Sequence, residues 1–327
     1  AYEVFETLNA RGQPLKQADL IKNKLLREAS RKAHSYLNNV TNAWESAVEP
    51  FQAEDTRVNV TDFLTMHLKF KTGNPSSFTG RTAYREFAKA IGDIFTPKQY
   101  AEELRKASEG ATPVIRNNTD YEETIEDEWF CSMHLETFGY KWAYAPLIAL
   151  AAQGSHHTDN DFRLLLKLCH NFSVRRFMVG QDYSAGQYVR DMDDIALTVA
   201  DHGVGDATKL MKKLSPDAEF TRDLTLYAPS ENKWGFYIHY EIERHLGSGA
   251  GVIPNVRQAN QHLEHIVPQD KKATGWRTMR QESRFDDKDF DTEIRRIGNL
   301  LILEGNHNRR ASNHGWSKKQ GIYAKSR

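Results

Sequence analysis

The residues best suited to chemistry lie near the C-terminus, in the stretch QHLEHIVPQD that begins at Gln261. Glu264 directly precedes His265 in an apolar alternation typical of a short strand, and Pro268 closes the turn that follows. A neutral imidazole at a strand end can take a proton from water, and a neighbouring carboxylate can bind a hard divalent ion. His262 shares the strand face of Glu264 and is a candidate for support or substrate contact. A strand end with a hydrogen-bonded histidine is the alternative.

A second polar pair follows in the stretch IGNLLILEGNHNRR. Asn299 begins a predicted second strand, and Asn308 stands where the next helix is predicted to begin. A carboxamide oxygen suits Mg²⁺ or Mn²⁺, so Asn308 is a candidate metal ligand, while His307 is a rival that spacing does not exclude. Arg309 and Arg310 would follow along the path of a phosphate backbone. An ordinary core strand after a turn is the alternative.

These strands need a small folding unit to bring them together. GSGAG, at residues 247–251, is a flexible run of small residues, and beyond it strand, loop, strand and helix predict an α+β module over residues 247–327. Residues 29–246 instead place apolar side chains at three- and four-residue spacing. The sequence therefore predicts a mainly α chain: a helical bundle followed by a C-terminal α+β module.

Charge is balanced over the whole chain but not along it. There are 44 Lys and Arg against 44 Asp and Glu, yet from Asp291 to the C-terminus eight basic residues accompany three acidic ones. This local excess, to which Lys318 belongs, indicates one surface that faces an anion. A solvated basic tail explains the same count equally well.

Composition favours a protein of the cytoplasm. The chain is 39% apolar and 27% charged, without an apolar run of membrane-spanning length or a secretory signal. Cys131 and Cys169 lie in apolar helical patterns, as reduced core thiols do, and they form no CxxC zinc framework. We therefore expect a cytoplasmic protein with no membrane contact.

Two polar groups in the helical region have less specific interpretations. Arg175 and Arg176 either form salt bridges with an acidic helix or contact a DNA backbone. The acidic stretches DNDF and DMDD, at residues 159–162 and 191–194, predict a helix cap and a solvated helix face, because neither fits a calcium loop.

The C-terminal pattern LEHIVPQ … IGNLLILEGNHNRRASNHGWSKKQGIYAKS resembles the HNH, or ββα-metal, nuclease domain that closes the GmrSD-type modification-dependent restriction endonucleases. The resemblance implies that His265 is the general base and that Asn299 steadies the loop or ring that presents it. It also implies that Asn308, with Glu264, binds a divalent metal, Mg²⁺ or Mn²⁺. The cations implied to steer the DNA backbone are Arg309, Arg310 and Lys318.

The chain also departs from relatives with this domain. It lacks the cysteine pairs of the zinc-bearing HNH proteins, and Asn308 stands where many relatives place a second histidine. Asn313 and Lys318 fall on later positions of the family pattern, for which the residues alone give no role.

The first 28 residues resemble a different part of the same family. VFETLNARGQPLKQADLIKNKLL is similar to the tail of its GmrS-like, ParB-related domain. The Asp-Gly-Gln-Gln-Arg motif that carries nucleotide chemistry in that domain does not occur here, so we expect nucleotide to act only through a region upstream of this chain. Phosphorothioate-sensing SspE-like proteins join both domains on one polypeptide.

The sequence thus predicts three segments: a GmrS-like tail at 1–28, a helical domain at 29–246 and an HNH nuclease domain at 247–327. The resemblance implies metal-dependent cleavage of phage or modified DNA in an antiphage restriction system. An inactive DNA-binding or sensor module is the first alternative, and a helical interaction protein without a nucleic-acid role is the second.

Overall fold

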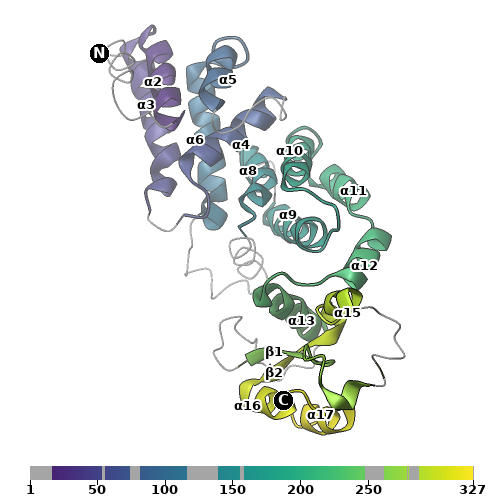
Figure 1. The fold of residues 1–327 in the computed structure, drawn as a ribbon. Coiled ribbons are helices and arrows are strands. Elements are labelled where there is room, and N and C mark those ends of the chain that lie inside the picture. Colours follow the sequence, from purple (N-terminus) through teal and green to yellow (C-terminus); the bar gives the residue numbers. More distant parts are fainter. Residues whose placement is uncertain are drawn as a thin grey trace. The chain divides into compact units, whose positions relative to one another are not determined.

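The computed structural model describes most of the chain and divides it into two compact units (Figure 1). Unit 1 contains Ala1–Phe177 and Asp182–Pro216, and unit 2 contains Met178–Gln181 and Asp217–Arg327. The chain is mainly helical, as predicted, and its described part holds a single two-stranded sheet near the C-terminus. The described residues are 17–53, 56–73, 82–115, 139–154, 158–246, 261–277, 279 and 287–326.

Helices build the described part of unit 1, and several begin at a polar cap. The Asn59 side chain accepts a hydrogen bond from the Asp62 backbone N–H, and Thr158 with Asp161 forms a capping box, which confirms the predicted cap in DNDF. The helices are α2 (Gln17–Ser30), α3 (His34–Val48), α4 (Val60–Thr72), α5 (Ala83–Ala90), α6 (Pro97–Ile115), α8 (Ala145–Ala151), α9 (Asp159–Phe172), α10 (Ala185–His202) and α11 (Val204–Leu214).

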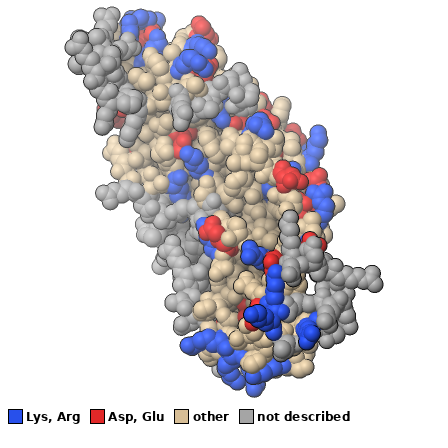
Figure 2. All heavy atoms as spheres, in the orientation of Figure 1, with Lys and Arg blue, Asp and Glu red and all other residues tan. Residues whose placement is uncertain are grey.

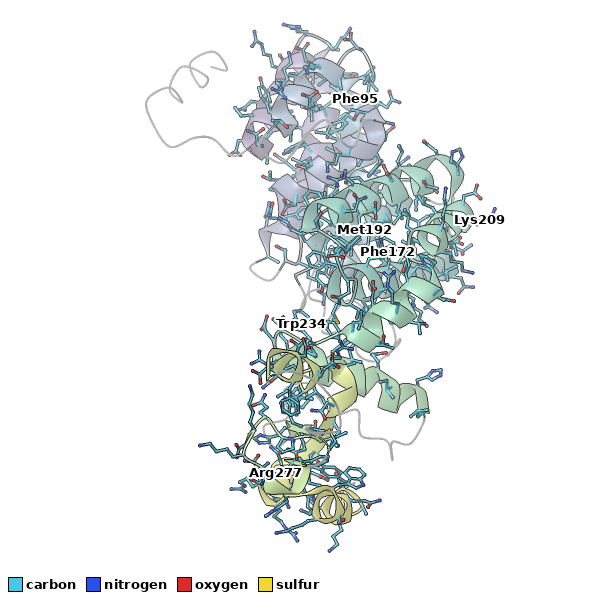
Figure 3. The ribbon with its side chains drawn as sticks, turned by 45° about the vertical axis from the view of Figure 1, so that its right-hand side comes forward. Phe95, Phe172, Met192, Lys209, Trp234 and Arg277 are labelled. Atoms are coloured by element: carbon cyan, nitrogen blue, oxygen red, sulfur yellow. The ribbon has the colours of Figure 1, made fainter. Side chains whose placement is uncertain are left out.

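The apolar faces of these helices form the core of unit 1. Helix α3 packs against α6, and α10 packs against α8 and α11. Figure 3 shows Phe172 of α9 and Met192 of α10 within this unit, where both side chains are buried, whereas Lys209 of α11 is exposed. The three- and four-residue spacing therefore marked buried helix faces correctly.

The predicted solvated face at residues 191–194 is wrong at two positions. Asp191 and Asp193 are buried. Asp193 forms an ion pair of 2.5 Å with Lys69 of α4, and Asp191 accepts a hydrogen bond of 2.5 Å from the Tyr183 hydroxyl. A carboxylate is buried only with a partner, and Lys69 is distant in the sequence, so the local acidic pattern did not reveal the burial.

Other predictions for the helical region have mixed outcomes. Cys169 is fully buried, as expected of a core thiol, whereas Cys131 lies outside the described residues. Arg175 donates to the Ser215 hydroxyl and carbonyl at 2.9 and 2.8 Å, and Arg176 lies over the Tyr183 ring.

In the described part of the chain, every helix is too short or too polar to cross a membrane.

Unit 2 is built around a hairpin of β1 (Gln261–His265) and β2 (Leu300–Glu304), which pair antiparallel with His265 opposite Leu300. Both strands lie where the sequence predicted them. The other elements of the unit are the helices α12 (Asp217–Leu226), α13 (Asn232–Leu246), α15 (Asp287–Glu293), α16 (Gly305–Ala311) and α17 (Trp316–Tyr323), with single 3-10 turns at Thr274–Trp276 and Ile297–Asn299.

Unit 2 begins at Asp217, earlier than the predicted module boundary at 247, because α12 and α13 pack with the hairpin. A Cβ added to Gly235 of α13 would lie 2.6 Å from the Leu263 side chain. The Ile297 N–H donates to the Tyr227 carbonyl at 2.8 Å, which ties the end of α12 to the turn before β2. The GSGAG stretch itself lies outside the described residues.

Candidate active site

Strand alternation divides the hairpin side chains between two faces. Glu264 and Leu301 are cross-strand partners and so share one face, and Leu301 and Leu303 pack there with Ala311 of α16. Helices α16 and α17 therefore cover the face of Glu264. The side chain of His265 leaves from the opposite face, at the last residue of β1.

Asn299 fixes the loop that follows His265. Its side-chain oxygen accepts from the Val267 N–H at 2.8 Å, and its amide donates to the carbonyls of Val267 at 3.0 Å and Ile294 at 2.7 Å. The Asn299 carbonyl also accepts from the Ile266 N–H. The two strand ends are thus joined by a carboxamide whose hydrogen bonds satisfy three backbone groups.

The His265 imidazole is half-buried and lies 3.0 Å from the Gln269 amide, Nε2 to Nε2. Burial lowers the pKa of His265 below its usual value, and the charges of Lys319 and Arg295 act in the same direction, whereas Glu264 opposes them. The imidazole is therefore mainly neutral at pH 7. A neutral ring that accepts from Gln269 at Nε2 carries its proton on Nδ1. The only lone pair of this tautomer is on Nε2, so His265 can act as a base once the exposed Gln269 amide turns away from it.

Glu264 is buried and bound by two groups of α17. The Lys319 ammonium donates to its Oε1 at 2.5 Å, and the Tyr323 hydroxyl donates to the same oxygen at 3.1 Å. Lys319 also donates to the His265 carbonyl at 2.6 Å. One buried cation therefore holds both the carboxylate and the strand end that carries the imidazole.

Sequence reasoning chose Lys318 and missed Lys319. Lys318 is exposed, with its ammonium 2.8 Å from His314 Nε2, whereas Lys319 is fully buried. The available signal was spacing: Lys319 lies three and four residues before Ile322 and Tyr323, on the apolar side of the helix.

The remaining candidates lie on or near α16. Asn308 is half-buried, and its side chain makes no hydrogen bond to the described part of the chain. It is the fourth residue of α16 rather than the first, because the helix begins at Gly305. The rival ligand His307 is instead paired with Glu304, Nδ1 to Oε2 at 3.1 Å. Arg309 and Arg310 are exposed.

Asn313 has a contact that its sequence position did not suggest. Its amide donates to Asp270 Oδ2 at 3.2 Å, and Asp270 Oδ1 accepts from the Lys272 N–H. The turn between α16 and α17 is thereby joined to the loop that follows His265.

The donor set fits a metal that takes few protein ligands. Among the described residues, no cluster of three His, Cys, Asp or Glu could hold an ion. Glu264 Oε2 makes no hydrogen bond in that part of the chain, and the Asn308 carboxamide is likewise without a partner there. Mg²⁺ keeps several waters and takes one or two protein oxygens together with substrate phosphate. Glu264 and Asn308 therefore suit Mg²⁺ better than zinc, which is held by a cage of three or four protein ligands.

Basic side chains gather over α16 and α17, at the lower end of the view in Figure 2. Residues 305–327 contain six Lys or Arg and no Asp or Glu. The exposed cations among them are Arg309, Arg310, Lys318 and Lys325. A phosphate backbone is the chemical complement of such a surface.

One comparison with known proteins covers the part of the chain that contains the candidate site. Residues 215–327, about a third of the chain, match the family model of the GmrSD restriction endonucleases, C-terminal domain. The match confirms the resemblance read from the sequence and begins within two residues of unit 2. No curated protein matches the chain.

Proposed function

Because residues 215–327 match the family model of the GmrSD restriction endonucleases, C-terminal domain, we propose that this chain is a metal-dependent DNA endonuclease with an HNH-type site in unit 2. The observation that carries the proposal is the setting of His265. The imidazole has a lowered pKa, stands at the end of β1 and is followed by a loop that Asn299 fixes.

In this proposal His265 is the general base. It accepts a proton from water as the water oxygen attacks phosphorus, and the P–O bond to the leaving group breaks. Asn299 holds the loop after the imidazole, and Lys319 holds its backbone carbonyl. Fixing a base near its reactive geometry lowers the cost of reaching the transition state.

We propose Asn308 and Glu264, through Oε2, as the residues that hold a divalent ion, Mg²⁺ or Mn²⁺. Such an ion supplies charge stabilisation for the phosphate oxygens during displacement. Arg309, Arg310 and Lys318 would bind the flanking backbone, since all three are exposed. Phage or modified DNA is the substrate that the family context favours.

Relaxation of supercoiled plasmid tests the proposal directly. Wild-type protein is expected to nick with Mg²⁺ or Mn²⁺, and His265→Ala is expected to lose about 10²- to 10⁴-fold in rate, the usual contribution of a general base. His202→Ala is a matched control, because His202 is an exposed histidine at the end of α10. Equal nicking by His265→Ala and wild type would show that His265 is not the base.

The Lys319–Glu264 pair favours a second candidate function, an inactive DNA-binding or sensor module. A carboxylate already neutralised by a buried ammonium has less charge to offer a metal. This candidate predicts a DNA mobility shift without nicking at any concentration of Mg²⁺ or Mn²⁺. Plasmid modified at its bases or backbone, run beside unmodified plasmid, tests whether modification is sensed.

A further inference from the structure

One large aromatic side chain of unit 2 is exposed beside the candidate site. Trp316, the first residue of α17, is 47% exposed. Tryptophan has a large apolar surface and is highly buried on average, so an exposed indole on a polar, basic surface is unusual.

The Trp316 ring is held by its neighbours. It meets Trp276 and Tyr323 edge to face, at centroid distances of 6.4 and 6.3 Å. Trp276 is itself fixed, because its indole N–H donates to the His314 carbonyl at 2.8 Å. The indole of Trp316 therefore packs against two aromatic rings while about half of the residue stays exposed.

Two glycines allow this arrangement. Gly275 and Gly315 pack backbone against backbone, so a Cβ on Gly275 would lie 2.6 Å from the Gly315 Cα. This close approach brings the turn that carries Trp276 against the residue that precedes Trp316. Any larger residue at 275 would separate the two indoles.

The aromatic series leads from the surface to the candidate site. Tyr323 contacts Trp316 through its ring and Glu264 through its hydroxyl, at 3.1 Å from Oε1. Glu264 directly precedes His265. A group stacked on Trp316 would therefore lie on the helix that binds Glu264 and the backbone carbonyl of His265, at the strand end where a phosphate is to be cleaved.

The positive charge around Trp316 indicates which kind of ligand would stack on its ring. Lys318 lies two residues further on in the same helix, and residues 305–327 hold no acidic side chain. Arg277, labelled in Figure 3, is exposed and directly follows Trp276. An aromatic face among cations matches a base attached to its phosphate, since the ring stacks and the cations bind the anion.

We propose that Trp316 is a stacking platform for an unpaired base, so that the substrate carries a single-stranded or locally opened segment beside the scissile phosphate. In an intact duplex both faces of each base are covered by its neighbours, and only an unstacked base offers a face to an indole. The inference rests on the proposed nuclease function and specifies its substrate class.

Binding without cleavage tests this proposal. Fluorescence anisotropy is measured on the full chain in EDTA, with a labelled single strand of about 12 nucleotides and with the duplex of the same sequence. Trp316→Ala is expected to weaken single-strand binding about 5- to 100-fold and duplex binding less than about 2-fold. Trp316→Phe, which retains an aromatic face, is expected to keep most of the single-strand affinity.

Two further variants make the result specific. Leu164→Ala removes an equally exposed apolar side chain of unit 1, 47% exposed, and is expected to change neither affinity. Lys318→Ala is expected to weaken the binding of the single strand and of the duplex by the same factor. It should also reduce the salt dependence of binding, because it removes a phosphate contact. Thermal unfolding of each variant shows that the fold is retained.

Three outcomes would overturn the proposal: unchanged single-strand binding by Trp316→Ala, an equal loss for both ligands, or loss of a self-associated form by this variant alone. The last would assign the indole to an interface between copies. EDTA prevents cleavage, so this experiment measures binding alone. If Trp316 proves not to bind an unpaired base, the conclusion drawn from plasmid nicking by His265→Ala is unaffected. If the plasmid experiment instead shows that the protein does not nick DNA, the binding experiment still tests Trp316, because an inactive module can still bind single strands.

Discussion

Among the described residues, each unit buries one lysine against one carboxylate, and the two pairs have different surroundings. In unit 1, Lys69 meets Asp193 at 2.5 Å, and its ammonium also lies 4.7 Å from the centroid of the Trp142 ring. In unit 2, Lys319 meets Glu264 at the same distance. All four side chains are less than 10% exposed.

The difference lies in what else each lysine touches. Lys69 joins two helices of a core, α4 and α10, and its second neighbour is an aromatic ring. Lys319 instead donates to the carbonyl of His265, the proposed base. The same chemical pair thus fixes helix packing in one unit and the end of the strand that carries the proposed base in the other. Burial of a lysine alone does not indicate function; its remaining hydrogen bonds do.

Removing each lysine is expected to give the largest effect and to separate the two roles. Lys69→Met and Lys319→Met should each lower the free energy of unfolding of their own unit by about 3–5 kcal/mol, because each leaves a buried carboxylate unpaired. Denaturant unfolding followed by hydrogen exchange measures the loss in each unit. Among molecules that remain folded, only Lys319→Met should slow nicking.

Paired replacements sharpen this test. Lys69→Met with Asp193→Leu, and Lys319→Met with Glu264→Leu, remove both charges, which is often neutral for stability. We expect the first to restore stability and to nick as the wild type does, and the second to restore stability while nicking stays slow. Restored nicking in the second variant would show that neither Glu264 nor Lys319 takes part in the reaction.

A smaller effect is expected from two asparagines that bind backbone groups, one in each unit. Asn299→Ala leaves three backbone groups in unit 2 without their partner and should cost about 1–3 kcal/mol. Asn59→Ala removes the cap of α4 in unit 1 and should cost about 1 kcal/mol. Plasmid nicking should fall for Asn299→Ala only. A similar fall for both variants would mean that lost stability explains the result.

The candidate site was partly predictable because its local geometry is encoded locally. Apolar alternation placed both strands. The family resemblance implied that Asn299 steadies the loop after His265, and the place of Asn299 directly before the second strand brings its side chain to the Val267 backbone. These relations need only strand pairing, which a short antiparallel hairpin supplies.

What could not be predicted depends on partners distant in the sequence. The local sequence did not indicate that Lys319, 55 residues away, binds Oε1 of Glu264. Asp193 was expected in solvent, yet Lys69 binds it across 124 residues. The start of unit 2 was missed for the same reason: α12 and α13 have ordinary helical patterns, and only their packing with the hairpin assigns them to it.

Among the described residues, two histidines have a lowered pKa, His67 in unit 1 and His265 in unit 2. His67 is fully buried among aromatic rings, and neither ring nitrogen has a hydrogen-bond partner in the described chain. Burial, assisted by the charge of Lys71, lowers the pKa of His67 to about 3. The half-buried His265 keeps a partner in Gln269, so burial serves packing at one site and proposed chemistry at the other.

His67→Phe is expected to stabilise unit 1 by about 1–2 kcal/mol at pH 7, because it removes two buried polar atoms that have no partner. With a folded pKa of about 3 against 6.5, the unfolded state binds more protons in between. Stability of the wild type should therefore fall as the pH drops below about 6.5, at up to about 1.4 kcal/mol per pH unit. Denaturant unfolding between pH 7 and pH 4 should show a shallower loss in His67→Phe, whereas the exposed control His202→Phe should keep the wild-type slope. Equal slopes in all three proteins would mean that His67 becomes protonated without unfolding.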